Sequence, residues 1–370
     1  MTVVAESPSD APIQARTALG VITGWSAVSA FGIGTAAASA GLRSTDRPES
    51  LSCEVDDWTA IVVPDFDIRA ELGSKGTRSL DRLTGLTVTA VRELLGDLGG
   101  RDEIGGCDDI ALVLGTDTGS TKSMMDFTRD SLVGEKPYHV DPSRFPNAVM
   151  NCAAGRSAIW YSLRGPNATV SSGRVAGLSA LQYSSRILRG GQAEAVICGA
   201  AEEYTVNRAW LERLIRGPRP EPVTLGEGCA LFLLEKTAGP GRTPLATLLS
   251  TSFRVCAPGM GVDPVQLMTS CIASALRDAG VRPEQVGIMA GAGDVDGIES
   301  AALARAGLSS AAAIDVSDRI GDTGAACTSF ALASVLVTVR DSPGTIAVVT
   351  AYDRDGAMGC AVLRVGEAEQ

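Results

Sequence analysis

Residues 165–177 constrain the fold more than any other part of this chain. They read Gly-Pro-Asn-Ala-Thr-Val-Ser-Ser-Gly-Arg-Val-Ala-Gly, a β-favouring run and a turn of small residues, and an amphipathic pattern follows over 178–188. Such a strand–turn–helix unit places its turn at a helix N-terminus, where free N–H groups and the helix dipole stabilise negative charge. Several enzyme folds present a nucleophile there. This turn carries Arg174, which is no nucleophile and stays protonated near neutral pH.

Short β-branched runs alternate with helical patterns along the rest of the chain. In the first half we expect strands at 19–25, 110–115, 167–171, 195–199 and 230–235, and helices at 78–98, 143–162 and 177–188. The second half repeats this order, with strands at 244–253, 287–291, 345–352 and 360–365 and helices at 264–279, 298–306 and 327–340. This alternation predicts parallel sheets that helices cover on both faces.

The chain divides into a tail and two halves. Residues 1–16 are polar and aperiodic, which predicts a disordered N-terminal tail. The Gly239-Pro240-Gly241 turn predicts a boundary between an N-terminal half over 17–238 and a C-terminal half over 242–370. Residues 331–339 are apolar nearly all round, which predicts a helix enclosed between two sheets.

Composition excludes several function classes. A net charge of −11 without a basic cluster argues against nucleic acid and anionic membranes as partners. We see no signal peptide and no apolar run long enough to span a bilayer, so we expect a cytoplasmic protein. Nine scattered cysteines without Cys-x-x-Cys spacing predict reduced, buried thiols. The single histidine, His139, excludes His-based zinc sites, and we expect no metal or cofactor.

Four segments together resemble a known family. They are 142–155, with Pro-Ser-Arg-Phe-Pro-Asn followed by Asn151 and Ala-Ala-Gly; 163–166, Leu-Arg-Gly-Pro; 190–202, Gly-Gly-Gln-Ala-Glu-Ala-Val-Ile-Cys-Gly-Ala-Ala-Glu; and 225–235, Leu-Gly-Glu-Gly-Cys-Ala-Leu-Phe-Leu-Leu-Glu. In this order, over most of residues 18–366, they resemble β-ketoacyl synthases, and among these the chain-length factor subunits of type II polyketide systems. The resemblance implies an α/β, thiolase-like fold with duplicated βαβαβ halves in a five-layered αβαβα sandwich.

The family's catalytic positions are all altered in this sequence. The resemblance places Arg174 where an active synthase has its nucleophilic cysteine, Gly291 at the first catalytic histidine and Asp322 at the second. The usual lysine is Ser317. Chain-length factors typically carry glutamine at the cysteine position, so Arg174 departs from that pattern too and argues against decarboxylase activity. We therefore predict no catalytic residue.

A buried arginine requires an anionic partner, because an unpaired buried charge is very costly. Since the matching family positions converge on one pocket, we predict an ion pair between Arg174 and Asp322. Asp294 and Asp296 are the alternative partners.

The segment after Gly119 is the candidate tunnel wall. Within the family, the matching segment sets the depth of the acyl tunnel, so the resemblance makes Met124, Met125, Phe127 and Thr128 the chain-length candidates. Methionine and phenylalanine side chains give a flexible apolar surface suited to an acyl chain. The alternative is an ordinary helix that packs its apolar face into the core.

The resemblance implies a non-catalytic chain-length factor. It would form a heterodimer with a catalytic ketosynthase subunit and shape the acyl tunnel, while the acyl carrier protein docks mainly on the partner, as the acidic charge balance suggests. One alternative is a stand-alone thiolase-fold acyltransferase or hydrolase with an unusual nucleophile such as Ser171 or Ser172, although no matching histidine would activate it. Another is a homodimeric acyl-binding scaffold.

Overall fold

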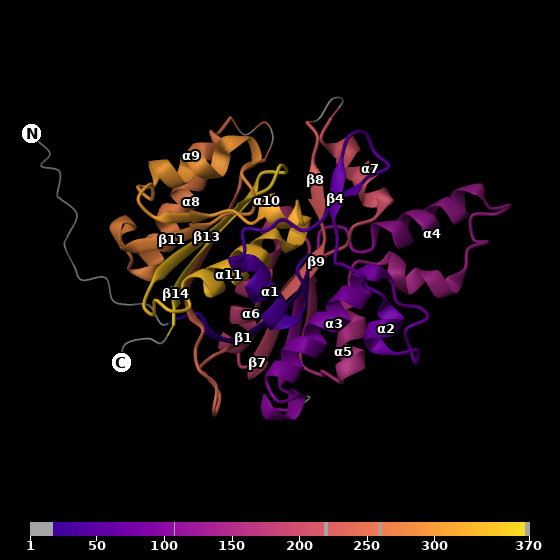
Figure 1. The fold of residues 1–370 in the computed structure, drawn as a ribbon, viewed down its shortest axis with the longest axis horizontal. Helices are drawn as coiled ribbons and strands as arrows, with labels where there is room; N and C mark the ends of the chain where they lie inside the picture. The colour runs from indigo at the N-terminus through magenta and orange to yellow at the C-terminus, as the bar shows by residue number, and fades with distance from the viewer. Residues whose placement is uncertain (1–17, 107, 218–220, 258, 260, 367–370) are drawn as a thin grey trace, which may run out of the picture.

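The computed structural model describes residues 18–106, 108–217, 221–257, 259 and 261–366 (Figure 1). The predicted disordered tail over 1–16 lies outside the described residues. Within them, an 11-stranded sheet dominates the fold.

Two groups of five strands within this sheet share one topology. The first runs β6 (Asn167–Val170), β5 (Ile110–Gly115), β7 (Ala195–Glu202), β9 (Gly228–Glu235) and β1 (Gly20–Ser29). The second runs β12 (Ala312–Ile314), β11 (Val286–Ala290), β13 (Ile346–Tyr352), β14 (Ala357–Val365) and β10 (Ala246–Val255). In chain order both groups read third, second, fourth, fifth, first, so the predicted duplication is confirmed. β1 and β10 join the groups from Gly20↔Leu248 to Ile22↔Ala246, and β2 (Gly32–Ile33) pairs with β1.

The prediction of parallel sheets is confirmed for only part of each strand group. The third, second and fourth strands of each group are parallel, whereas the fifth is antiparallel to both of its neighbours. In the second group, residues 353–356 alone connect β13 to β14. A connection that short makes a hairpin, because a parallel crossover needs a dozen residues or more.

Helices complete the five layers. Hydrophobic clusters join α3 (Arg82–Asp97) and α5 (Cys152–Tyr161) to the first strand group, and α8 (Pro264–Ala279) and α9 (Ile298–Arg305) to the second. A third cluster joins both groups to α6 (Ala176–Arg189) and α11 (Cys327–Thr338), which contact each other. Every α11 residue from Cys327 to Val337 is buried, which confirms the enclosed helix.

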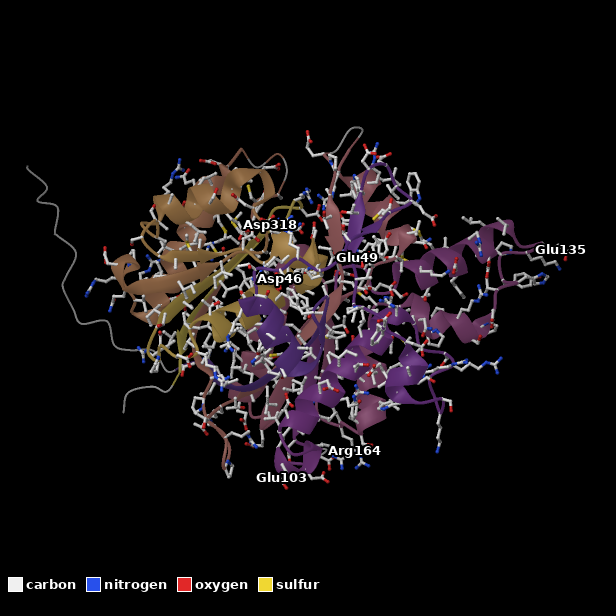
Figure 2. The ribbon with its side chains drawn as sticks, in the orientation of Figure 1. Asp46, Glu49, Glu103, Glu135, Arg164 and Asp318 are labelled. Atoms are coloured by element: carbon white, nitrogen blue, oxygen red, sulfur yellow. The ribbon has the colours of Figure 1, made fainter. Side chains whose placement is uncertain are left out.

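A projection extends from the first half (Figure 1). It consists of α4 (Thr121–Val133) and the 3₁₀ segment η2 (Pro142–Ala148), with Glu135 at its outer end in Figure 2. The single helix predicted over 143–162 is wrong, because η2 ends at Ala148 and α5 begins only at Cys152. Pro146 explains the break, since proline lacks the N–H that an α-helix needs.

Smaller elements complete the described chain. The helices are α1 (Gly34–Arg43), α2 (Ile68–Leu72), α7 (Val206–Ile215) and α10 (Ser317–Ile320). Strands β3 (Leu51–Ser52), β4 (Thr59–Ile61) and β8 (Thr224–Gly226) form a second sheet, and the 3₁₀ turns are η1 (Arg101–Glu103), η3 (Gly173–Val175), η4 (Pro283–Gln285), η5 (Val295–Gly297) and η6 (Gly324–Ala326). The Gly239–Gly241 turn lies between β9 and β10, and the two domain limits stay predictions. None of the helices described here is both long and apolar enough to cross a bilayer.

Candidate functional site

Arg174 lies in η3, between the end of β6 and the start of α6. Gly173 has a φ of +54°, which favours glycine, and a Cβ atom there would lie 2.2 Å from Oδ2 of Asp353. This turn directs the Arg174 side chain into the protein, where the residue is only 8% exposed. The predicted strand–turn–helix unit and the buried arginine are both confirmed.

The predicted ion pair is confirmed as well. Nη2 of Arg174 bonds to Oδ2 of Asp322, and Nη1 donates to the carbonyl oxygen of Ala292 at 2.5 Å. The alternative partner Asp294 instead accepts from the backbone N–H of Glu299 at 2.9 Å, at the start of α9.

Asp322 is the centre of a larger network. Its Oδ2 also accepts from Nη2 of Arg216 at 2.6 Å, and its Oδ1 accepts from the backbone N–H of Gly324 at 3.0 Å. Nη2 of Arg208 donates to its carbonyl oxygen at 3.0 Å. Burial alone would raise the pKa of Asp322, but Arg174, Arg216 and Arg208 outweigh burial and hold this pKa well below its usual value. The carboxylate therefore stays ionised.

Arg216 is the partner that the sequence did not indicate. It follows α7, its side chain is 9% exposed, and its Nε donates to Glu212 at 3.2 Å. Its guanidinium also lies over the ring of Trp58, 5.5 Å from the centroid. The one signal in the sequence is that a buried carboxylate at Asp322 needs cationic partners. No motif around Arg216 marks this arginine as such a partner.

Gly291 follows β11 and lines a neighbouring cavity of about 380 Å³, which shares Gly293 and Asp294 with the cavity beside Arg174 and Asp322. A Cβ atom on Gly291 would be 3.6 Å from both carboxylate oxygens of Glu299, which is 2% exposed. Neither oxygen has a hydrogen-bond partner of good geometry within the described part of the chain, although the Thr350 hydroxyl and the Ala292 backbone lie close enough to favour the ionised form. Burial raises the pKa of Glu299 to about 8, so the group is mainly neutral at pH 7. Arg174 and Asp322 are in direct contact, and Gly291 directly precedes Ala292, whose carbonyl oxygen accepts from Arg174.

Among the described residues that line the pocket around Arg174 there is no cysteine and no histidine, whereas three are carboxylates, Asp294, Asp318 and Asp322. The cavity beside Arg174 and Asp322 measures about 330 Å³ and is also lined by Ser317 and Arg354. Cys327 lies nearby, with Sγ 3.4 Å from the carbonyl oxygen of Arg174, but burial raises its thiol pKa strongly and keeps it protonated.

The alternative nucleophiles are engaged elsewhere. Ser171 donates to the carbonyl oxygen of Asp117 at 2.8 Å, and the hydroxyls of Ser172 and Ser179 are 3.0 Å apart. His139 is exposed, with its ring edge-on to Tyr138 at 5.0 Å, and lies in the loop after α4. No group of His, Cys, Asp or Glu side chains among the described residues is arranged to hold a metal ion.

The four tunnel candidates lie on α4. Sδ of Met125 accepts from Asn207 at 3.4 Å, the Phe127 and Phe145 rings are 5.7 Å apart, Met124 is half-buried and Thr128 is exposed. A cavity of about 830 Å³ lies next to α4, but the α4 side chains lining it are polar. They are Ser120, Lys122, Ser123 and Asp126, where Ser120 is the N-cap residue. The structure does not place the predicted apolar residues in this cavity, and their role stays a prediction.

Comparison with known proteins identifies the class. The family model "Beta-ketoacyl synthase, N-terminal domain" matches residues 32–213. A solved structure described as "The ishigamide ketosynthase/chain length factor" contains a chain 39% identical to this one, with a TM-score of 0.85 over 94% of this chain and 99% of that chain. The chain belongs to the β-ketoacyl synthase family and has its thiolase-like fold.

More distant relatives agree on the class. The 3-oxoacyl-[acyl-carrier-protein] synthase 2 of Synechocystis sp. (strain ATCC 27184 / PCC 6803 / Kazusa) is 26% identical over 249 residues, 60% of this chain and 59% of that protein. The alignment thus spans about three fifths of that relative's length. A type II polyketide synthase acyl-carrier protein in complex with its hexaketide-bound ketosynthase, AntDE:AntF, is similar in fold alone, at 16% identity and a TM-score of 0.78 over 95% of this chain and 100% of that chain.

Proposed function

We propose that this chain is a non-catalytic chain-length factor of a type II polyketide synthase. The observation that carries the proposal is the buried Arg174–Asp322–Arg216 cluster, in which we assign Arg174 and Asp322 to the positions of the family's nucleophile and second histidine. The 39% identity to a chain of a ketosynthase/chain length factor supports this choice within the family.

In this function the chain supplies surface and tunnel wall rather than chemistry. A catalytically complete ketosynthase subunit carries out decarboxylation and condensation, and the two subunits form a heterodimer. The acyl carrier protein docks mainly on the catalytic subunit, because an acidic carrier is repelled by a chain of net charge −11.

Co-expression with a ketosynthase that has an intact Cys-His-His set tests the partnership. Native mass spectrometry should detect a stable 1:1 complex, and elongation products should appear only when both chains are present. Failure to form a complex, or homodimers that persist beside the ketosynthase, would contradict the proposal and favour the scaffold alternative.

Incubation with an acyl thioester tests for hidden catalysis. The intact mass should not change, because Ser171 and Ser172 lack an activating base among the described residues and Cys327 is held as the thiol. A covalent acyl adduct that S171A or S172A abolishes would instead establish a stand-alone enzyme.

Tryptophan substitutions on α4 test which face of this helix lines the acyl tunnel. If Met125 and Phe127 line the tunnel, M125W and F127W should shorten the product chains in the reconstituted complex, because a larger side chain reduces tunnel depth. S123W is the matched variant, since Ser123 lines the polar cavity on α4. Shorter products from S123W alone would show that the predicted face is wrong.

A further inference from the structure

The hairpin between β13 and β14 holds a carboxylate against the turn that carries Arg174. Oδ2 of Asp353 accepts from the backbone N–H of Arg174 at 3.0 Å. Its Oδ1 accepts from the backbone N–H of Asp355 at 2.9 Å, and its own N–H donates to the carbonyl oxygen of Ala357 at 2.8 Å. The hairpin therefore fixes both the position and the direction of this carboxylate.

This position is where the fold would hold an external anion. The N–H of Arg174 precedes α6, and the start of a helix offers both free donors and the positive end of the dipole. The carboxylate also fills the space above Gly173, where a Cβ atom would be 2.2 Å from Oδ2. An oxyanion cannot reach the N–H of residue 174 while Asp353 occupies it.

We propose that Asp353 is a resident anion that closes this helix N-terminus to external anions. The site is then closed twice, by the Arg174 side chain and by Asp353 at the backbone. This inference concerns the chain by itself and does not depend on a ketosynthase partner. It implies that cysteine at position 174 would not be enough to rebuild a reactive thiol.

The test compares R174C with R174C/D353N. Asparagine keeps an acceptor oxygen for the N–H of residue 174 but removes the charge, so a purely structural contact survives. The rate of alkylation by iodoacetamide is followed from pH 5 to 10 at the peptide containing residue 174, by mass spectrometry. For R174C we expect the midpoint of the curve of alkylation rate against pH at or above the ordinary pKa of cysteine, about 8.5. For R174C/D353N we expect this midpoint about one to two pH units lower.

The other charged groups around residue 174 are common to both variants. They are Asp322, Arg216, Arg47, Asp294 and Asp318 at the pocket, Arg208 and Glu212 on α7, Glu299 on α9, Cys327 on α11, Arg354 on the hairpin and Asp117 after β5. The difference between the two midpoints therefore reports Asp353. Equal midpoints would overturn the proposal and reduce Asp353 to a structural contact of the hairpin.

A second experiment leaves Arg174 in place and needs no introduced thiol. D353A removes the carboxylate, and formate is the free ion closest to the group removed. Formate should raise the melting temperature of D353A above its value in chloride at the same ionic strength, while the native chain should respond equally to both salts. The same response to formate in both proteins would contradict a resident anion.

Discussion

D322N removes the carboxylate that Arg174 and Arg216 share, and so tests the buried cluster directly. Both guanidiniums bond to Oδ2, and the side chain of Asp322 is 11% exposed. Asparagine is nearly the same size but neutral, so two buried cations lose their common anion. Removing one partner of a buried ion pair costs about 3–5 kcal/mol, and we expect D322N to lose stability in this range.

R174M should cost less than D322N, about 1–3 kcal/mol, although it also removes a charge. The reason is that Asp322 keeps Arg216 at 2.6 Å and the N–H of Gly324 at 3.0 Å. D318N is the matched control, because Asp318 pairs with Arg47 at 3.5 Å but its side chain is 77% exposed. An exposed pair of this kind contributes less than about 1 kcal/mol.

Urea unfolding followed by circular dichroism from pH 3 to 8 measures these differences. The folded-state pKa of Asp322 is lowered, so its stabilisation is present above the unfolded value of about 3.9 and is lost as pH falls toward the folded value. The gap between native chain and D322N should be constant from pH 5 to 8 and narrow only below about pH 4. A D322N loss no larger than that of D318N would refute the cluster as a buried charge network.

Three other predictions follow from single residues. E299Q should reduce the pH dependence of stability. Because burial raises the pKa of Glu299 to about 8, this group alone removes about 1.4 kcal/mol of stability per pH unit as pH rises between roughly pH 4 and 8, beside further contributions from Glu202 and Glu203. A free energy of unfolding that changes with pH equally in both proteins would contradict this. G173A should lower stability by about 1–3 kcal/mol, because of the positive φ and the approach to Asp353, whereas G191A, also at positive φ but with open space for a Cβ atom, should cost less. F330A should cost about 3–5 kcal/mol in the same assay, because Phe330 is 1% exposed in α11.

Local signals explain which elements the sequence predicts well. The helix predicted over 264–279 has the bounds of α8, because Asp263 caps its start, Pro264 occupies the first turn and Gly280 ends it in the left-handed region. The helix predicted over 143–162 fails because Pro146 lies inside an otherwise helical pattern. Strand direction fails for another reason, since alternation of strands and helices says nothing about a fifth strand that returns through a hairpin.

The site follows the same rule. The Arg174–Asp322 pair was predictable, because burial of an arginine requires an anion and family resemblance brought the two positions together. Arg216, Asp353 and Glu299 were not predictable. Their contacts join residues far apart in the chain, 106 residues for Arg216 with Asp322 and 179 for the Arg174 amide with Asp353. Neither a periodic pattern nor a local motif in the sequence indicates contacts between residues so far apart in the chain.

The pocket around Arg174 joins the two strand groups. Arg174 and Arg216 belong to the first half, whereas Ala292, Asp322 and Asp353 belong to the second, so the polar contacts of the pocket run across the junction. The strand groups pair directly over only three residues on each of β1 and β10, and a hydrophobic cluster that includes α6 and α11 packs against both of them. An apolar layer keeps the two strand groups together but does not prevent small lateral displacements between them, because hydrophobic attraction is non-directional. Charged hydrogen bonds fix direction. The contacts of Arg174 and Arg216 with Ala292, Asp322 and Asp353 therefore help to fix the two strand groups relative to each other.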